Sequence, residues 1–230
     1  MTQTAPELRE LAVNWMKSEF PASIIVTELS VADWGGASID VAAITPTEIV
    51  GVEIKGAGDS ASRLPLQGLA YGRVARRMWL LPCDSLRETC FRKRPAGWGR
   101  LEIHDGAVRP MNRATKLGGR IKTEYGWKHE QLRDDSRYDP DTAGENRTLC
   151  PWSMCGTLWR DELYELARLS RVQVHGKANV QPLMEAICEQ LPAPTIHALM
   201  IERLRQRAWK KPVIDLRPKS ERRAEQGGLL

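Results

Sequence analysis

The chain has 230 residues, a formal net charge of +5, 42% hydrophobic residues and 27% charged residues. These values are typical of a globular protein with one sizeable core and an appendage, or of two small domains. No apolar run approaches the roughly 18 residues that span a bilayer, and the first ten residues lack the pattern of a signal peptide. We therefore expect a cytoplasmic protein with no membrane partner. The modest positive charge is compatible with a polyanionic partner without requiring one.

Hydrophobic periodicity predicts an α/β fold in the first half of the chain. Leu8 and Trp15 share one face of an amphipathic helix that Pro21 closes. Runs of β-branched residues predict strands, and residues 45–48 are typical of a hairpin turn. The expected elements, in chain order, are a helix at 6–20, strands at 23–31, 38–44 and 49–55 with a turn at 33–36, a helix at 62–77, and strands at 78–81 and 101–104. This order predicts a mixed central sheet flanked by helices.

The second half of the chain predicts a loop followed by helices. Residues 112–150 are polar and locally basic, which is typical either of a solvated linker or of a segment that orders on DNA. The three helices expected at 159–170, 179–191 and 195–209 are compatible with a helix-turn-helix module and with a packing appendage. We therefore divide the chain into a core at 1–111, a basic polar loop or linker at 112–150, a helical subdomain at 151–211 and a flexible tail at 212–230.

Two acids and a lysine interrupt the apolar strands of the expected hairpin. Asp40 lies in the strand at 38–44, and Glu53-Ile54-Lys55 ends the strand at 49–55. Side chains alternate along a strand, so Glu53 and Lys55 point the same way. Carboxylates rarely stand among apolar strand residues unless they are paired or bound to a metal. The pattern predicts that these groups converge at one end of a small sheet, where two carboxylates suit a hard divalent cation such as Mg²⁺.

Beyond the hairpin, the order of residues resembles the PD-(D/E)xK superfamily of metal-dependent nucleases. After Lys55 come an acid at Asp59, then Arg63-Leu64, then Gln67-x-x-x-Tyr71, then the apolar stretch 78–81. The order is similar to that of the small bacterial and phage branch typified by MmcB-like and sce7726-family proteins, over roughly residues 7 to 105. The chain departs from the superfamily pattern at its first position, where Ile39 stands in place of proline.

The resemblance implies a restriction-endonuclease-like core and a role for each motif residue. Asp40 and Glu53 would hold Mg²⁺ or Mn²⁺ together with the backbone carbonyl of Ile54, and Lys55 would orient the attacking water and stabilise the phosphate. Gln67 would join the catalytic group. Three further residues carry two interpretations each: Glu28 as another metal ligand or an exposed strand residue, Arg63 as a phosphate contact or the partner of Asp59, and Tyr71 as a DNA contact or a packing residue.

A basic cluster follows the expected strand at 78–81. Its members are Arg87, Arg92, Lys93, Arg94 and Arg100. Arg92, Lys93 and Arg94 suit contacts to a DNA backbone, and a solvated face is the alternative. Trp98 lies among these charges and suits either stacking on a base or closing the edge of the core.

Five cysteines in a chain without a secretion signal argue against a disulfide framework. Cys83, Cys90, Cys150 and Cys155 number enough for an iron–sulfur or zinc site, but neither pair has the Cys-x₂-Cys spacing of a zinc knuckle. We therefore expect reduced thiols that pack in the core rather than a metal site.

The sequence thus predicts a deoxyribonuclease that depends on Mg²⁺ or Mn²⁺ and hydrolyses phosphodiesters through a metal-activated water. The alternative is a non-cleaving accessory protein of phage or DNA-repair type, which binds DNA or another protein through the same fold. RNA is a third possible substrate. A homodimer or a protein partner could use the C-terminal helices.

Overall fold

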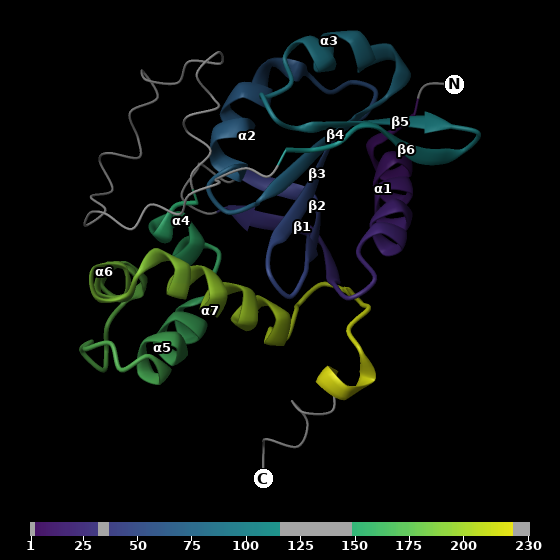
Figure 1. The fold of residues 1–230 in the computed structure, drawn as a ribbon. Helices are drawn as coiled ribbons and strands as arrows, with labels where there is room; N and C mark the ends of the chain where they lie inside the picture. Colours follow the sequence, from purple (N-terminus) through teal and green to yellow (C-terminus); the bar gives the residue numbers. More distant parts are fainter. Residues whose placement is uncertain (1–2, 32–36, 116–148, 223–230) are drawn as a thin grey trace.

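One mixed sheet of seven strands organises the molecule (Figure 1), in the order β6-β5-β4-β3-β2-β1-β7. The structure is a computed structural model and describes residues 3–31, 37–115 and 149–222. Its strands are β1 (Ile24–Val31), β2 (Ala37–Ile44), β3 (Ile49–Lys55), β4 (Arg77–Pro82), β5 (Gly99–His104), β6 (Ala107–Asn112) and β7 (Ile214–Asp215). Strands β1, β2 and β3 form an antiparallel meander, β3, β4 and β5 run parallel, and β6 and β7 pair antiparallel at the two edges.

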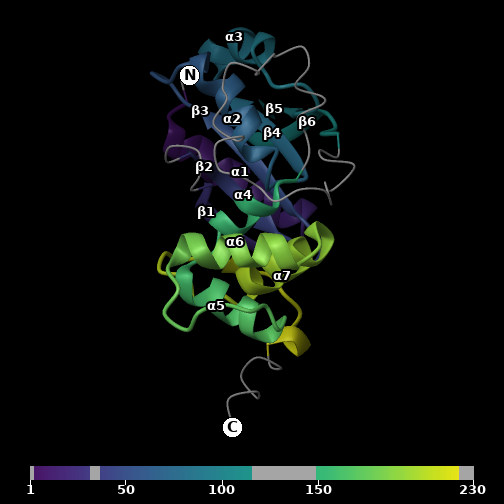
Figure 2. The ribbon, with the colours of Figure 1, turned by 90° about the vertical axis from the view of Figure 1, so that its left-hand side faces the viewer.

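Helices cover both faces of this sheet. They are α1 (Ala5–Glu19), α2 (Leu64–Tyr71), α3 (Arg87–Arg92), α4 (Pro151–Gly156), α5 (Arg160–Leu169), α6 (Val180–Gln190) and α7 (Ala193–Gln206), with 3₁₀ turns η1 (Ala61–Arg63) and η2 (Asp84–Leu86). Figures 1 and 2 show α1 alone on one side of the sheet and the C-terminal helices grouped below it. The expected fold class, an α/β mixed sheet flanked by helices with further helices at the C-terminus, is confirmed.

The sheet separates two hydrophobic cores. The α1-side core joins Leu8, Trp15 and Met16 of the helix to alternate residues of the strands, such as Val41 and Val52. The α2-side core is larger and runs from the other face of the sheet through α2 into α4–α7. Because α4–α7 share this core with the sheet, the expected helical subdomain at 151–211 is packed against the sheet rather than built around a core of its own.

The helix expected at 62–77 is shorter than predicted. A 3₁₀ turn at Ala61–Arg63 leads into α2, which ends at Tyr71, with Gly72 as its C-cap. The amide of Arg76 then donates to the carbonyl of Ile49, and parallel pairing of β4 with β3 begins at Arg77. Pairing with a central strand therefore overrides the helical pattern of the last six residues.

Four short elements were not predicted: α3, β6, α4 and β7. The expected domain boundary at 111 falls inside β6, which forms a hairpin with β5. Strand β7 lies in the expected tail at 212–230 and pairs with β1. Helices α3 and α4 have six residues each, too few for helical periodicity to identify, and β7 has two. Strand β6 contains Pro110 and is almost wholly exposed, so it shows no apolar alternation.

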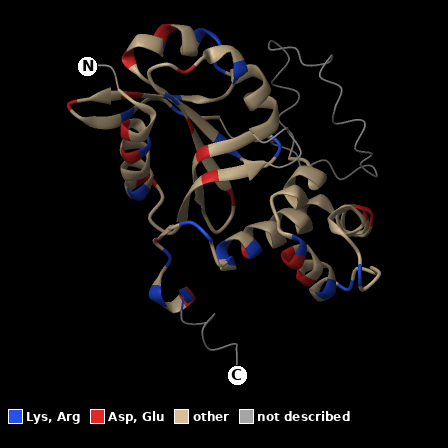
Figure 3. Cartoon of the chain, turned by 180° about the vertical axis from the view of Figure 1, so that it is seen from behind, with Lys and Arg blue, Asp and Glu red and all other residues tan. Residues whose placement is uncertain are grey.

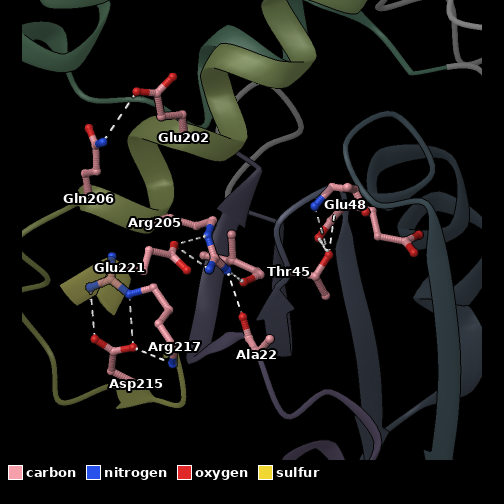
Figure 4. A network of polar contacts seen from close by, with 11 residues as sticks. Ala22, Thr45, Glu48, Glu202, Arg205, Gln206, Asp215, Arg217 and Glu221 are labelled. Carbon is pink, nitrogen blue, oxygen red and sulfur yellow. Dashed lines mark hydrogen bonds and ion pairs between the residues drawn. The ribbon is translucent and has the colours of Figure 1, made fainter. Parts of the chain in front are cut away.

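Arg205 of α7 fixes the C-terminal segment to the sheet (Figure 4). Its guanidinium donates to the carbonyls of Ala22 (3.1 Å) and Ile44 (2.8 Å) and to the Glu221 carboxylate (2.6 Å). Asp215 and Arg217 form a second ion pair beside it (2.9 Å). The α7 helix buries Ile196, Met200, Ile201 and Leu204 as well as Arg205, while Thr195, Glu202 and Gln206 on its other face are exposed. The buried face joins the α2-side core, as the packing interpretation predicts, and the helix-turn-helix interpretation stays a prediction.

Three expectations fall wholly or largely outside the described residues: the turn at 33–36, the loop at 116–148 and the end of the tail at 223–230. In the described part of the chain, no helix combines the length and hydropathy that a bilayer crossing requires.

Replacing Arg205 with Met should lower the free energy of unfolding by about 2–3 kcal/mol, because two buried carbonyls and Glu221 lose a charged donor. Urea denaturation measures the change. The control is Arg168→Met, which removes an exposed pair with Glu165 and should cost under about 0.5 kcal/mol. Equal costs for the two variants would contradict the assignment of Arg205 as the anchor of the C-terminal segment.

Candidate active site

The candidate site follows one line across the antiparallel strands. Pairs Thr27↔Val41 and Leu29↔Ile39 place Glu28 of β1 opposite Asp40 of β2. Extending the β2–β3 register one residue beyond Val41↔Val52 places Asp40 opposite Glu53. Opposed residues on neighbouring strands lie about 4.5–5.5 Å apart. The register alone therefore brings three carboxylates from distant parts of the chain into one row.

Both β1 and β2 lose their regular alternation at this row. Residues of the two strands that contact the α2-side core are Ile24, Val26, Leu29 and Val31 in β1 and Ala37, Ile39, Ala42 and Ile44 in β2. Residues that contact this core are normally two positions apart, but Val26 and Leu29, which flank Glu28, are three apart, and so are Ile39 and Ala42, which flank Asp40. The pairing of β1 with β2 nevertheless continues without a shift. Glu28 has a positive φ of 57°, which is costly for a residue with a side chain and recurs at functional sites.

The irregularity lets Asp40 close the end of the β2–β3 ladder. Its Oδ2 accepts a hydrogen bond from the Ile54 amide (2.7 Å), where a regular strand would supply a backbone carbonyl. The carboxylate is thereby fixed beside Glu53. The two carboxylates meet at this point, as the sequence pattern predicts. Ile54 contacts Asp40 through its amide, and the role of its carbonyl that the resemblance implies stays a prediction.

Glu53, Lys55 and Gln67 form a buried network beside Asp40. Lys55 donates to Glu53 Oε1 (2.6 Å) and to Gln67 Oε1 (3.0 Å), and Gln67 Nε2 donates to Glu53 Oε1 (2.6 Å). Tyr71 lies one helical turn beyond Gln67, accepts from Gln67 Nε2 (3.2 Å) and donates to the Ser38 carbonyl (2.7 Å). Every bond of this network except the last joins residues of the predicted motifs.

Trp98 packs against Tyr71 on the side of the core. Its ring is 1% exposed and stacks on Tyr71, with centroids 6.0 Å apart and planes 10° from parallel. A ring this buried has no free face for a nucleic-acid base. Of its two interpretations, the structure places Trp98 in the core, where it fixes the ring of Tyr71 and through it the amide of Gln67.

Burial makes ionisation of the carboxyl groups costly. It raises the pKa of Glu53 to about 8, with the nearby Asp40 charge adding to the effect and Lys55 opposing it. Burial also raises the pKa of Asp40, and the Ile54 amide opposes that shift. The Tyr71 hydroxyl has its pKa raised by burial and by Glu53, so it stays a neutral donor.

The network faces a cleft of about 430 Å³ that opens to solvent. Predicted site residues supply most of its lining: Glu28, Asp40, Glu53, Ile54, Lys55, Arg63, Gln67 and Tyr71. Glu53 Oε2 is buried and has no hydrogen-bond partner among the described residues. An orphaned carboxylate oxygen beside a second carboxylate fits a divalent cation, which would offset its desolvation. The two carboxylates, Asp40 and Glu53, cannot fill the coordination sphere of a metal by themselves. The described residues contain no group of three or more His, Cys, Asp or Glu that could hold a metal.

Glu28 and Arg63 line the cleft without joining the network. The Glu28 carboxylate pairs with Lys211 and lies 3.7 Å from Arg9, and the Lys211 contact lowers its pKa. Its expected role as a metal ligand is therefore untested, and its present partners are cations. Asp59 accepts from the Gly56 amide (2.8 Å), so it caps the loop after β3 instead of pairing with Arg63.

The basic cluster lies apart from the cleft. Arg92 and Lys93 are exposed at the end of α3, and neither they nor Arg94 line the cleft. Arg87 and Arg100 pair with Glu102 (3.6 and 3.2 Å). Figure 3 shows basic positions on α3 at the far end of the sheet from the C-terminal helices. Contact of this cluster with DNA stays a prediction.

The four predicted thiol positions divide between the two cores. Cys83 lies in the α1-side core, and Cys90, Cys150 and Cys155 lie in the α2-side core. Burial raises the pKa of Cys90 to about 11 and also raises that of Cys150, which keeps both thiols protonated.

Sequence patterns missed two cations: Arg9 of α1, which lines the cleft, and Lys211 after α7, which contacts Glu28 of the lining. Arg9 appears as one charge on an ordinary amphipathic helix, and Lys211 as one of many charges near the end of the chain. Close approach of α1 to β3 brings Arg9 in: a Cβ on Gly56 would lie 2.8 Å from the Ala5 Cα. No local signal predicts either contact, because each depends on packing between distant segments.

Comparison with known proteins adds little to this description. No family model matches the chain, and no curated protein matches it. The structure of a protein of unknown function from Silicibacter pomeroyi is similar over 77% of this chain and 98% of its own, with 16% sequence identity and a TM-score of 0.40. Similarity at this level assigns no family and no activity.

Replacing Glu53 with Gln should change how stability depends on pH. The folded-state pKa of about 8 lies above the usual 4.5, so protonated Glu53 stabilises the fold below the usual pKa, and this contribution is lost as the pH rises through 8. The neutral Gln has no such loss. Urea denaturation without divalent ions should show wild type losing stability relative to Glu53→Gln between about pH 5 and about pH 9. Parallel pH profiles would contradict the raised pKa.

Proposed function

We propose that the protein is a nuclease of PD-(D/E)xK type that hydrolyses phosphodiester bonds in DNA with Mg²⁺ or Mn²⁺. The observation that carries the proposal is the meeting of Asp40, Glu53 and Lys55 at one solvent-accessible cleft, with Glu53 Oε2 buried and without a hydrogen-bond partner among the described residues. Asp40 also closes the β2–β3 ladder, but the buried pair of Glu53 and Lys55 has no comparable structural role, since apolar residues would fill the space at lower cost.

The residues of the cleft fit the chemistry of phosphodiester hydrolysis. Asp40, Glu53 Oε2 and the Ile54 carbonyl would hold the divalent cation. When bound, the cation supplies charge stabilisation at the phosphate and lowers the pKa of a coordinated water. Lys55 places its ammonium beside Glu53, where it stabilises negative charge on the non-bridging oxygens. Gln67 holds Lys55 and Glu53 at fixed distance from each other through its two hydrogen bonds.

The surroundings of the cleft support a polyanionic substrate. Arg9 and Arg63 line it together with Lys55, and the whole chain carries a net charge of +5. A phosphodiester would bring a further negative charge next to the two carboxylates, and the surrounding cations would offset that repulsion. No cleft residue marks recognition of a 2′-hydroxyl, so the choice between DNA and RNA rests on the substrate panel below.

Substituting Asp40→Asn or Lys55→Met should lower DNA cleavage by about 100-fold or more, because each change removes a charge next to the reacting phosphate. The assay uses linear, nicked, branched and single-stranded DNA, and RNA of matched sequence, each with Mg²⁺, Mn²⁺ or EDTA. Lys177→Met is the control, since Lys177 is exposed in the connection between α5 and α6. Circular dichroism of each variant monitors the fold.

Metal-dependent cleavage that survives both substitutions would overturn the assignment of these residues. Wild-type protein that binds DNA and cuts none of the substrates would instead favour the non-cleaving accessory protein. Cleavage restricted to RNA would keep the site and change the substrate.

A further inference from the structure

We propose that Arg9, Glu28 and Lys211 form a phosphate-binding subsite at the mouth of the cleft, in which Glu28 holds the place of a nucleic-acid phosphate until substrate arrives. A backbone phosphate next to the scissile one would displace Glu28 and take both cations. The inference rests on the proposed function, because it assigns residues that position the same substrate.

The three side chains converge from the two ends of the chain and the middle of a strand. Glu28 pairs with Lys211 and lies 3.7 Å from Arg9. Lys211 lies three residues before β7, which pairs with β1 at Ile24 and Ile25, so the segment that leads into β7 brings Lys211 to Glu28. A phosphate held by Lys211 and Arg9 would lie two strands from Glu53, near Asp40.

Each of the two cations lies on, or next to, elements that are fixed to the sheet. Arg9 lies on α1, whose start docks on the loop after β3 through the bond from Ala57 to the Gln3 carbonyl (3.0 Å). Lys211 lies between α7 and β7, and these are fixed to the sheet by Arg205, Asp215 and Arg217 (Figure 4). Side chains held in this way lose less freedom when they bind a ligand.

The interactions of Glu28 are weak enough to exchange. The side chains of Arg9, Glu28 and Lys211 are 36%, 43% and 65% exposed, and exposed ion pairs contribute about 0–1 kcal/mol to stability. A structural anchor such as Arg205 is buried. Arg9 contacts Glu28 through one terminal nitrogen, Nη2, and its side chain lines the cleft, where a ligand can reach the guanidinium. A phosphate offers more acceptor oxygens than one carboxylate.

The backbone of Glu28 is consistent with a replaceable counter-ion rather than a packing residue. Its φ of 57° turns it out of the regular strand, and it is the residue at which the alternation of β1 fails. Strain of this kind persists where the surroundings require it. It presents an acid at the mouth of the cleft, where it repels nucleic acid unless the two cations neutralise it.

The test is binding of a short fluorescein-labelled DNA duplex by the full chain, measured over a range of salt concentrations with Ca²⁺ in place of Mg²⁺. Arg9→Ala and Lys211→Ala should each weaken binding about five- to tenfold and reduce the salt slope by about one unit. Glu28→Gln should act in the opposite direction and tighten binding about threefold or more, because it frees both cations. The control pair is Arg168→Ala and Glu165→Gln, an exposed ion pair on α5 (2.7 Å), which should leave binding unchanged.

The sign of the Glu28 effect separates the subsite from a structural ion pair, whose loss would not tighten binding. DNA binding that is unchanged or weakened by Glu28→Gln would overturn the subsite while leaving the nuclease assignment intact. Absence of wild-type binding to duplex or single-stranded DNA would overturn both. The predicted pattern in a protein that cuts no DNA would support the subsite and overturn the nuclease.

Discussion

The register of the β1–β2–β3 meander is the constraint on which the rest of the site depends. It aligns Glu28, Asp40 and Glu53 across three strands, and the segment before β7 adds the contact of Lys211 with Glu28. A slip of one residue in any of these strands would turn its whole apolar set to the other face. The two cores on either side of the sheet therefore fix the positions of the charged groups as a consequence of burying the strands.

The charges in this row oppose the stability of the fold that positions them. Glu53 and Lys55 are 2% and 6% exposed and stand among apolar neighbours, where desolvation is costly even for a hydrogen-bonded pair. A series of contacts from the core offsets part of this desolvation cost. Trp98 stacks on Tyr71, the Tyr71 hydroxyl accepts from Gln67, and Gln67 donates to the Glu53 carboxylate. Such a chain of support is expected where a site must be held in place before its ligand binds.

Much of the fold and the centre of the site could be predicted because both depend on local patterns. The hairpin turn at 45–48 and the alternation on either side of it align Asp40 with Glu53 from sequence spacing alone. Gln67 and Tyr71 follow from helical periodicity. Arg9 and Lys211 could not be predicted, since the approach of α1 to β3 and the edge pairing of β7 are set by tertiary packing. The length of α2 was missed for the same reason: pairing of β4 with β3 decides where the helix ends.

The most direct test of this account is X-ray diffraction from crystals soaked in Mn²⁺, with anomalous scattering used to locate the ion. The account predicts an ion coordinated by Asp40 and Glu53, with Glu53 Oε2 among its ligands and Lys55 and Gln67 still in contact with each other. It would be contradicted by crystals saturated with Mn²⁺ in which no ion lies between these carboxylates and Glu53 remains bound only to Lys55 and Gln67.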